Sequence, residues 1–280
     1  MKKIIINADD LGYSLWVNGE IERCIVSGVV TSSTLMANAP GFKDGVRIAK
    51  QYPHISIGVH LNLVEFAPLT NLEIFRKHGI VGGDGNFIEG AIFAKSIDVE
   101  LKQAIFDEWD AQITKIEEEG VVLSHADSHQ HTHTISALNE ILCQVLDKHN
   151  IIRVRRNYIP SIRLMLFGNK NNVVKLDKSK AIKQKKHNFI YRKLNIFVVK
   201  YKKRRWNHYM KNIYTMTDAF YALRNFYYDY HLLSLDINSS IIELMCHPGH
   251  PAFQNETNIL SKLHTWLPKD FMLINYNDIN

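Results

Sequence analysis

Short apolar runs rich in Ile and Val alternate with longer amphipathic stretches along most of the chain. Apolar runs of about four to eight residues are typical of buried strands, and apolar positions three and four residues apart indicate helices. The pattern predicts strands at 3–8, 29–36, 55–60, 121–125, 151–155, 241–246 and 271–275, and helices at 16–27, 41–51, 96–119, 135–149, 217–224 and 256–266. Strands that alternate with helices favour an α/β fold with a parallel sheet.

Rossmann and barrel topologies both fit this rhythm. The first strand is not followed by Gly-x-Gly-x-x-Gly, so a dinucleotide site has little support. With 280 residues, 46% of them hydrophobic, the chain can bury the core of one large domain spanning 1–280. A Gly-rich stretch at 64–90 is predicted to be a loop, and about 157–212 an insertion or lid within that domain.

The positive charge is concentrated in one segment. Residues 151–212 hold 19 of the 34 Lys and Arg and one acid, whereas the rest has 15 bases and 27 acids, a net charge of −12. The high pI is therefore not a nucleic-acid-binding signature. Within the segment, 196–206 mixes aliphatic, aromatic and basic residues, which suits docking on an anionic membrane surface or an acidic partner. We favour the alternative, a solvated insertion whose apolar residues pack on the main body.

The lack of recognisable targeting signals and the cysteine spacing lead us to expect a cytoplasmic protein. There is no run of about 18 apolar residues to form a spanning helix. The start lacks the long apolar region and small-residue cleavage site of a signal peptide. Cys24, Cys143 and Cys246 have no metal-type spacing, which favours reduced thiols that fill the core.

Four of the predicted strands end in Asp or His, and this is the main functional signal. The residues are Asp9, Asp10, His60, His125, His129, His131, His133 and His247. A parallel barrel gathers such residues at the carboxyl ends of its strands. For the Asp pair alone, an Asx turn in which Asp10 caps a helix is the alternative. A single His after a strand is more often structural, but four such positions together favour a catalytic site.

One carboxylate and two neutral imidazoles, with open positions for water and substrate, make a catalytic divalent-metal site. We predict Asp10, His60 and His129 as its ligands, because Asp127 and the following serine place His129 at a turn from strand to loop. His131 alternates with His129 along the same segment, which suits a contact to the substrate or to a metal-binding residue.

The remaining groups suit hydrolysis of an amide or ester. Asp9 can act as general base on a water that the metal activates. Arg153 or Arg156, at the end of the strand 151–155, could pair with Asp9 and keep it ionised. His247, at the end of another strand, could protonate a leaving amine.

Five sequence blocks carry a resemblance to a known family. They are Asn7-Ala8-Asp9-Asp10-Leu11-Gly12, Thr31-Ser32-Ser33-Thr34, Gly58-Val59-His60-Leu61-Asn62-Leu63, Asp127-Ser128-His129-Gln130-His131 and Met245-Cys246-His247-Pro248. In this order, and over nearly the whole chain outside about 160–212, the chain resembles the YdjC/ChbG/HpnK carbohydrate deacetylases. The resemblance implies a distorted TIM-like (β/α) barrel that removes acetyl groups from N-acetylated sugars such as chito-oligosaccharides.

The resemblance also implies a divalent metal, usually magnesium, on the residues matching Asp10, His60 and His129, and a homodimer. The donor set itself also accepts zinc or another transition metal. Two departures affect the region expected to line the sugar site, which includes Asp218. The segment 160–212 is unusually basic and aromatic, and Ala222 stands where a Gly is more usual.

Two other functions remain open from the sequence. One is deacetylation of a membrane-linked glycolipid, with 196–206 as the surface anchor. The other is a non-catalytic protein that kept the barrel and binds an acidic polymer through the basic segment, in a manner sensitive to salt.

Overall fold

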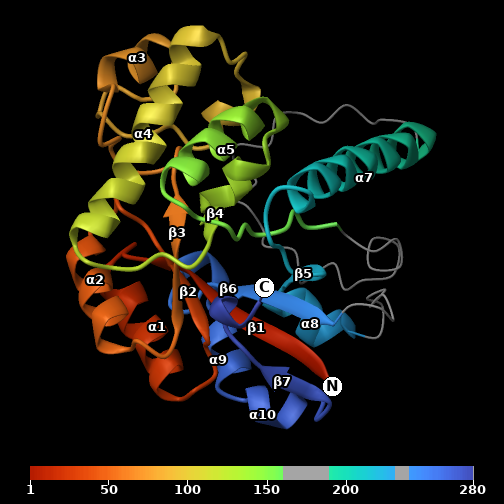
Figure 1. The fold of residues 1–280 in the computed structure, drawn as a ribbon. Coiled ribbons are helices and arrows are strands. Elements are labelled where there is room, and N and C mark those ends of the chain that lie inside the picture. Colours follow the sequence, from red (N-terminus) through yellow and green to blue (C-terminus); the bar gives the residue numbers. More distant parts are fainter. Residues whose placement is uncertain (160–188, 231–239, 280) are drawn as a thin grey trace.

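A parallel sheet forms the centre of the molecule (Figure 1). The computed structural model describes residues 1–159, 189–230 and 240–279. Within them, a seven-stranded sheet has the order β4-β3-β2-β1-β6-β5, and β7 pairs with β1. The strands are β1 (Lys2–Leu11), β2 (Ser32–Leu35), β3 (Ser56–Leu61), β4 (Ala126–Ser128), β5 (Ala219–Ala222), β6 (Ile241–Cys246) and β7 (Phe271–Leu273).

The sheet curls into a partial barrel with helices on its outside (Figure 1). Parallel bridges from Ala126 to Val154 and from Arg153 to Thr215 continue the curl from β4 toward the segment before β5. The helices are α1 (Leu15–Val26), α2 (Phe42–Gln51), α3 (Leu72–Lys77), α4 (Val99–Glu118), α5 (Asn139–Lys148), α7 (Phe189–Lys211), α8 (Leu223–Asp229), α9 (Glu256–Leu260) and α10 (Leu263–Trp266). This architecture confirms the predicted α/β fold and its distorted, TIM-like barrel.

Burial explains why the strongest sequence patterns form these elements. Ile4, Ile5 and Ile6 of β1 are all fully buried, as expected for a strand covered on both faces. The helix α4 is capped by Asp98, whose side chain accepts a hydrogen bond from the Leu101 backbone N–H at 2.9 Å. Its apolar stripe, centred on the fully buried Trp109, packs against the body of the protein.

The helix predicted at 217–224 is wrong. Ala219–Ala222 instead forms β5, which pairs in parallel with β6, and α8 begins only at Leu223. Phe220 and Tyr221 suit a pleated strand, and pairing with β6 overrides the weak helical spacing.

Other boundaries differ because pairing is set by neighbouring strands. The strand predicted at 121–125 begins only at Ala126, although Ser124 already donates its backbone N–H to Ile57. In the predicted strand 151–155, only residues 153 and 154 form bridges. The predicted loop 64–90 contains the short helix α3. Of the basic segment, 160–188 lies outside the described residues and 189–211 is the helix α7. The described residues contain no helix long and apolar enough to cross a membrane.

Candidate active site

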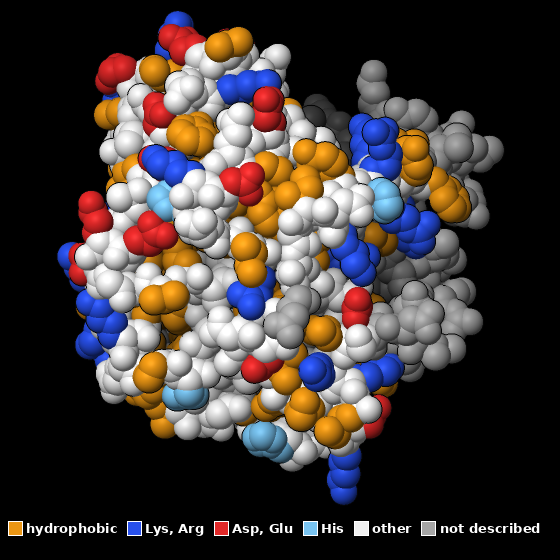
Figure 2. Space-filling model, viewed as in Figure 1, with side chains coloured by type: hydrophobic (Ala, Val, Ile, Leu, Met, Phe, Trp, Pro, Cys, Tyr) orange, Lys and Arg blue, Asp and Glu red, His pale blue; other side chains and the backbone are white. Residues whose placement is uncertain are grey.

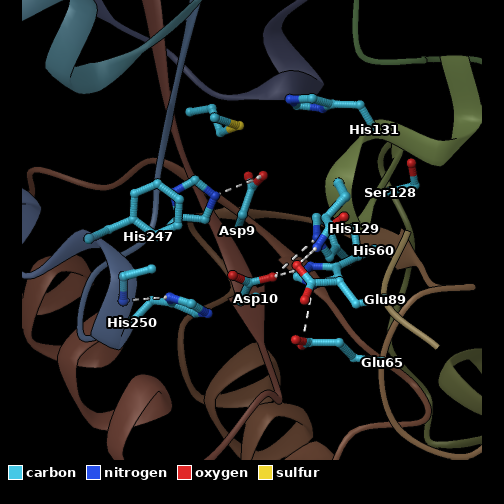
Figure 3. A pocket seen from close by; sticks show the side chains of 14 residues that line it. Asp9, Asp10, His60, Glu65, Glu89, Ser128, His129, His131, His247 and His250 are labelled. Carbon is cyan, nitrogen blue, oxygen red and sulfur yellow. Dashed lines mark hydrogen bonds and ion pairs between the residues drawn. The ribbon is translucent and has the colours of Figure 1, made fainter. Parts of the chain in front are cut away.

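A cavity of about 470 Å³ opens at the carboxyl ends of β1, β3, β4 and β6 (Figure 3). This volume lies in the range of pockets for small molecules. Its lining residues are Asp9, Asp10, His60, Glu65, Glu89, Ser128, His129, Gln130, His131, Met245, His247, His250, Ala252 and Phe253. The predicted residues from four distant strand ends therefore meet in one pocket.

A β-bulge lets two neighbouring aspartates face this pocket. Adjacent residues of a regular strand point to opposite sides of a sheet. The pairing of β1 with β2 shifts register between Ala8 and Leu11, and Asp10 has a left-handed backbone with φ 66°. Such a conformation is costly for a residue other than Gly and is concentrated at functional sites. Asp9 and Asp10 both line the cavity as a result.

Asp10, His60 and His129 form a buried cluster in which each residue offers a ligand atom within 4.8 Å of the others. Asp10 Oδ1 lies 3.3 Å from His60 Nε2 and 3.0 Å from His129 Nδ1 (Figure 3). Within the described part of the chain, no group hydrogen-bonds Asp10 Oδ2, although this oxygen is buried. A buried carboxylate oxygen without a partner, beside two imidazoles, fits a divalent cation.

The far nitrogen of each imidazole faces a second carboxylate. His60 Nδ1 lies 2.6 Å from Asp127 Oδ1, and Thr34 Oγ1 donates to Asp127 Oδ2 at 3.1 Å. His129 Nε2 lies 3.4 Å from Glu65 Oε2. Burial lowers the pKa of His60 and the Asp127 carboxylate raises it, to about 10 overall. Histidines that bind metals commonly donate their other N–H to a carboxylate, which fixes the ring and its tautomer.

Asp9 is held as an anion by Arg155. Both carboxylate oxygens of Asp9 accept hydrogen bonds at 2.6 Å from the guanidinium, and both residues are buried. Burial raises the pKa of Asp9, but the charge and hydrogen bonds of Arg155, together with His60 and His247, hold it below its usual value. The pairing of Asp9 with Arg153 or Arg156 is wrong. Arg153 donates to the Ile279 carbonyl at 2.8 Å, and Arg156 to the Thr217 carbonyl at 3.3 Å.

Arg155 also connects the pocket to the interior of the barrel. It contacts Asp127 at 2.5 Å and Glu243 at 2.7 Å, and Tyr276 donates to Glu243 at 2.5 Å. Burial raises the pKa of Glu243 to about 7 despite its contact with Arg155. His125 lies against this network, with its ring 3.6 Å from that of Tyr276. His125 is thus a core residue below the pocket.

His247 lies on the opposite wall of the pocket from the Asp10 cluster (Figure 3). Its Nε2 is 3.9 Å from Asp9 Oδ2, and its ring stacks on Phe253 with centroids 4.0 Å apart. Glu256 Oε2 lies 3.3 Å from Nδ1 and accepts the His247 backbone N–H at 2.6 Å. Burial lowers and Glu256 raises the pKa of His247, with a net rise. This geometry suits a group that holds a proton toward the cavity.

Two other predicted contacts have different positions. His131 lines the cavity, and burial and Arg155 lower its pKa to about 3, so its ring is neutral. Asp218 does not belong to the lining residues of this pocket. It lies at the amino ends of β5 and β6, where its Oδ2 accepts from the backbone of Ser240 and Ile241 at 3.0 Å. Asp218 therefore lies apart from the cavity in which the other predicted site residues meet.

The sequence interpretation missed Arg155, Glu65, Glu243 and Glu256. A signal existed for two of them. Arg155 alternates with Arg153 and so points to the same side of an extended segment. Glu65 follows His60 in the same strand-to-loop segment.

These features define a class of protein, a parallel α/β barrel with a candidate metal site at the carboxyl ends of its strands. The chain belongs to the YdjC-like protein family, whose pattern matches residues 3–272. The family resemblance found in the sequence is thereby confirmed. The crystal structure of an Enterococcus faecalis protein, proposed to be a cellobiose-phosphate cleavage protein, shares the fold. The match covers 99% of this chain and 98% of the Enterococcus faecalis chain, with a TM-score of 0.67 and 22% sequence identity.

Three curated relatives are carbohydrate deacetylases. Those of Vibrio cholerae serotype O1, Brevibacillus brevis and Clostridium beijerinckii are 35%, 34% and 32% identical over about 150 residues. The similar stretch is 53% of this chain and 57% of the Vibrio cholerae and Brevibacillus brevis proteins. The chain thus spans little more than half the length of the curated relatives it matches.

Proposed function

We propose that the protein is a hydrolase that removes acetyl groups from N-acetylated carbohydrates such as chito-oligosaccharides, with a divalent metal ion. The observation that carries the proposal is the convergence of Asp10, His60 and His129 around an unpartnered carboxylate oxygen, with ionised Asp9 beside them. The names of the curated relatives support the substrate class.

Each residue has a defined role in this proposal. Asp10, His60 and His129 would hold the cation, which supplies a water of lowered pKa and polarises the acetyl carbonyl. Asp9, oriented by Arg155, accepts the proton of the attacking water. His247, supported by Glu256, gives a proton to the leaving amine. The stacked ring of Phe253 offers an apolar face on which a sugar can pack.

Acetate release from N-acetylglucosamine oligomers tests this function. We expect release that a chelator stops and added divalent metal restores. The His60→Ala variant should lose both bound metal, measured by elemental analysis, and acetate release, because it removes one of three protein ligands. Absence of acetate release with every divalent metal supplied would contradict the proposal.

We further propose magnesium as the metal, a homodimer as the assembly and the cytoplasm as the location. The family resemblance supports the first two. The free thiols of Cys24, Cys143 and Cys246 support a reducing compartment. The single deacetylase domain spans 1–280 in this proposal.

A second candidate function, deacetylation of a membrane-linked glycolipid, is favoured by the outer face of α7. The helix projects from the body (Figure 1), and basic and hydrophobic side chains lie side by side there (Figure 2). Phe197 and Tyr201 are 59% and 62% exposed, whereas Trp206 and Met210 pack on the body. From the sequence we favour an insertion whose apolar residues pack on the main body. On α7 this packing describes only the side that faces the body. The segment 189–212 contains no acid, which suits an anionic surface.

Sedimentation with vesicles tests this second candidate. The full chain should sediment with phosphatidylglycerol-containing vesicles and not with phosphatidylcholine vesicles. Reversal of charge in an Arg204→Glu, Arg205→Glu variant should reduce binding by about 30-fold or more, since each basic residue near the surface contributes about 1 kcal/mol. Lys43→Glu, a single charge reversal on an exposed side chain outside α7, is the control. Equal sedimentation of both variants would refute a role for α7.

A further inference from the structure

The His129 imidazole lies between two carboxylates. Its Nδ1 is 3.0 Å from Asp10 Oδ1, and its Nε2 is 3.4 Å from Glu65 Oε2 (Figure 3). A proton on Nε2, directed at Glu65, leaves the lone pair of Nδ1 directed at Asp10 and the candidate cation position. His60 has the same arrangement, with Asp127 on the nitrogen remote from Asp10. A carboxylate thus lies behind each imidazole. Asp127 is within hydrogen-bond distance of His60, whereas Glu65 Oε2 faces His129 at ion-pair distance and has no hydrogen-bond partner among the described residues.

The backbone of Glu65 is fixed by a buried asparagine. Asn62 Oδ1 accepts the backbone N–H groups of Val64 and Glu65 at 2.9 and 3.2 Å. Asn62 Nδ2 donates to the Glu65 carbonyl at 2.7 Å, and Asn38 Nδ2 donates to the same carbonyl at 3.3 Å. These bonds hold a tight turn directly after β3, in the manner of an Asx turn. The backbone from which the Glu65 side chain extends is therefore held in place by the fold.

A second layer ties this turn to the helix α4. Gln112 Oε1 accepts the Asn62 backbone N–H, and Gln112 Nε2 donates to the Asn62 carbonyl, both at 2.8 Å. Gln112 Nε2 also donates to Glu108 at 2.7 Å. Asn62, Gln112 and Glu108 are all fully buried. A satisfied buried network of this kind specifies one geometry, and here it ends at the backbone N–H and carbonyl of Glu65, the residue whose carboxylate lies behind His129.

We propose that Glu65 is the positioning residue of His129, which orients the imidazole and fixes its tautomer for binding of the cation. This inference rests on the proposed metal-dependent function and assigns a role to a residue outside the three predicted ligands. Glu65 acts through His129. Its loss therefore weakens metal binding, and saturating metal restores turnover.

Titration with Co²⁺ alone, followed by its visible absorption, tests the inference. In the full chain, Glu65→Ala should bind Co²⁺ about 10–100-fold more weakly than the wild type, as for other groups behind metal-binding histidines. Glu65→Gln should recover part of this affinity, because the amide keeps the shape of the carboxylate and an oxygen that can accept the Nε2 proton. At saturating Co²⁺, kcat for acetate release should return close to the wild-type value, with KM little changed.

Glu89→Ala is the matched control, because it also removes a carboxylate from the pocket lining while its described hydrogen bond goes to Gln130. If Glu65 acted only through its negative charge, Glu65→Ala and Glu89→Ala would weaken Co²⁺ binding equally. This result would overturn the positioning role. If the wild type and His129→Ala both fail to bind Co²⁺, the proposed metal-dependent function itself is contradicted. Binding by the wild type with unchanged affinity in Glu65→Ala contradicts only the further inference.

Discussion

Asp9→Asn is expected to reduce kcat for acetate release by about 10²–10⁴-fold, the range for loss of a general base. The amide has nearly the same shape as the carboxylate but cannot accept the proton of the attacking water. Asp10, His60 and His129 are unchanged, so Co²⁺ affinity should stay within a few-fold of the wild type. Steady-state kinetics and Co²⁺ titration of the same preparation separate loss of the base from loss of the metal.

Asp218→Asn provides the control for this experiment. It makes the same chemical change at the amino ends of β5 and β6, outside the pocket lining. Its kcat should equal that of the wild type. A kcat of Asp9→Asn that matched Asp218→Asn would remove Asp9 from the mechanism and require another general base for the attacking water.

The positions of the pocket residues could be predicted because strand ends are visible in the sequence. Asp10, His60 and His247 follow apolar runs that form β1, β3 and β6. All these strands pair in parallel, so their carboxyl ends meet at one edge of the sheet. His129 follows β4, although the predicted strand lay a few residues too early. The parallel topology was therefore sufficient to predict that these residues lie in one pocket.

The contacts behind these residues could not be predicted, because they depend on register and depth. The bulge that turns Asp9 and Asp10 toward the same pocket has no sequence pattern of its own. Arg153 and Arg155 lie on one short segment, and only the register with β4 decides which of them reaches Asp9. The link from Glu65 to His129 likewise joins two loops that the hydrophobic pattern leaves undefined.

The position of Arg155 makes it the residue whose loss should most affect stability. Its guanidinium is fully buried and contacts three buried carboxylates, Asp9, Asp127 and Glu243. It also lies 5.1 Å from the centre of the Phe220 ring. Without the Arg155 guanidinium, these carboxylates would remain buried close together with no positive charge beside them, which is unfavourable in a medium of low polarity.

Arg155→Met should therefore lower the free energy of unfolding by about 3–5 kcal/mol, the usual cost of removing one partner from a buried ion pair. Arg155→Lys should recover part of this, since it keeps the charge but not the paired hydrogen bonds to Asp9. Arg153→Met is the matched control. Its hydrogen bonds go to backbone carbonyls of Ser124 and Ile279, and the cost should be about 1–2 kcal/mol. Urea unfolding of the three variants measures the difference. Equal losses at Arg153 and Arg155 would mean that the three carboxylates do not depend on the Arg155 charge, and that Asp9 is kept ionised by another group.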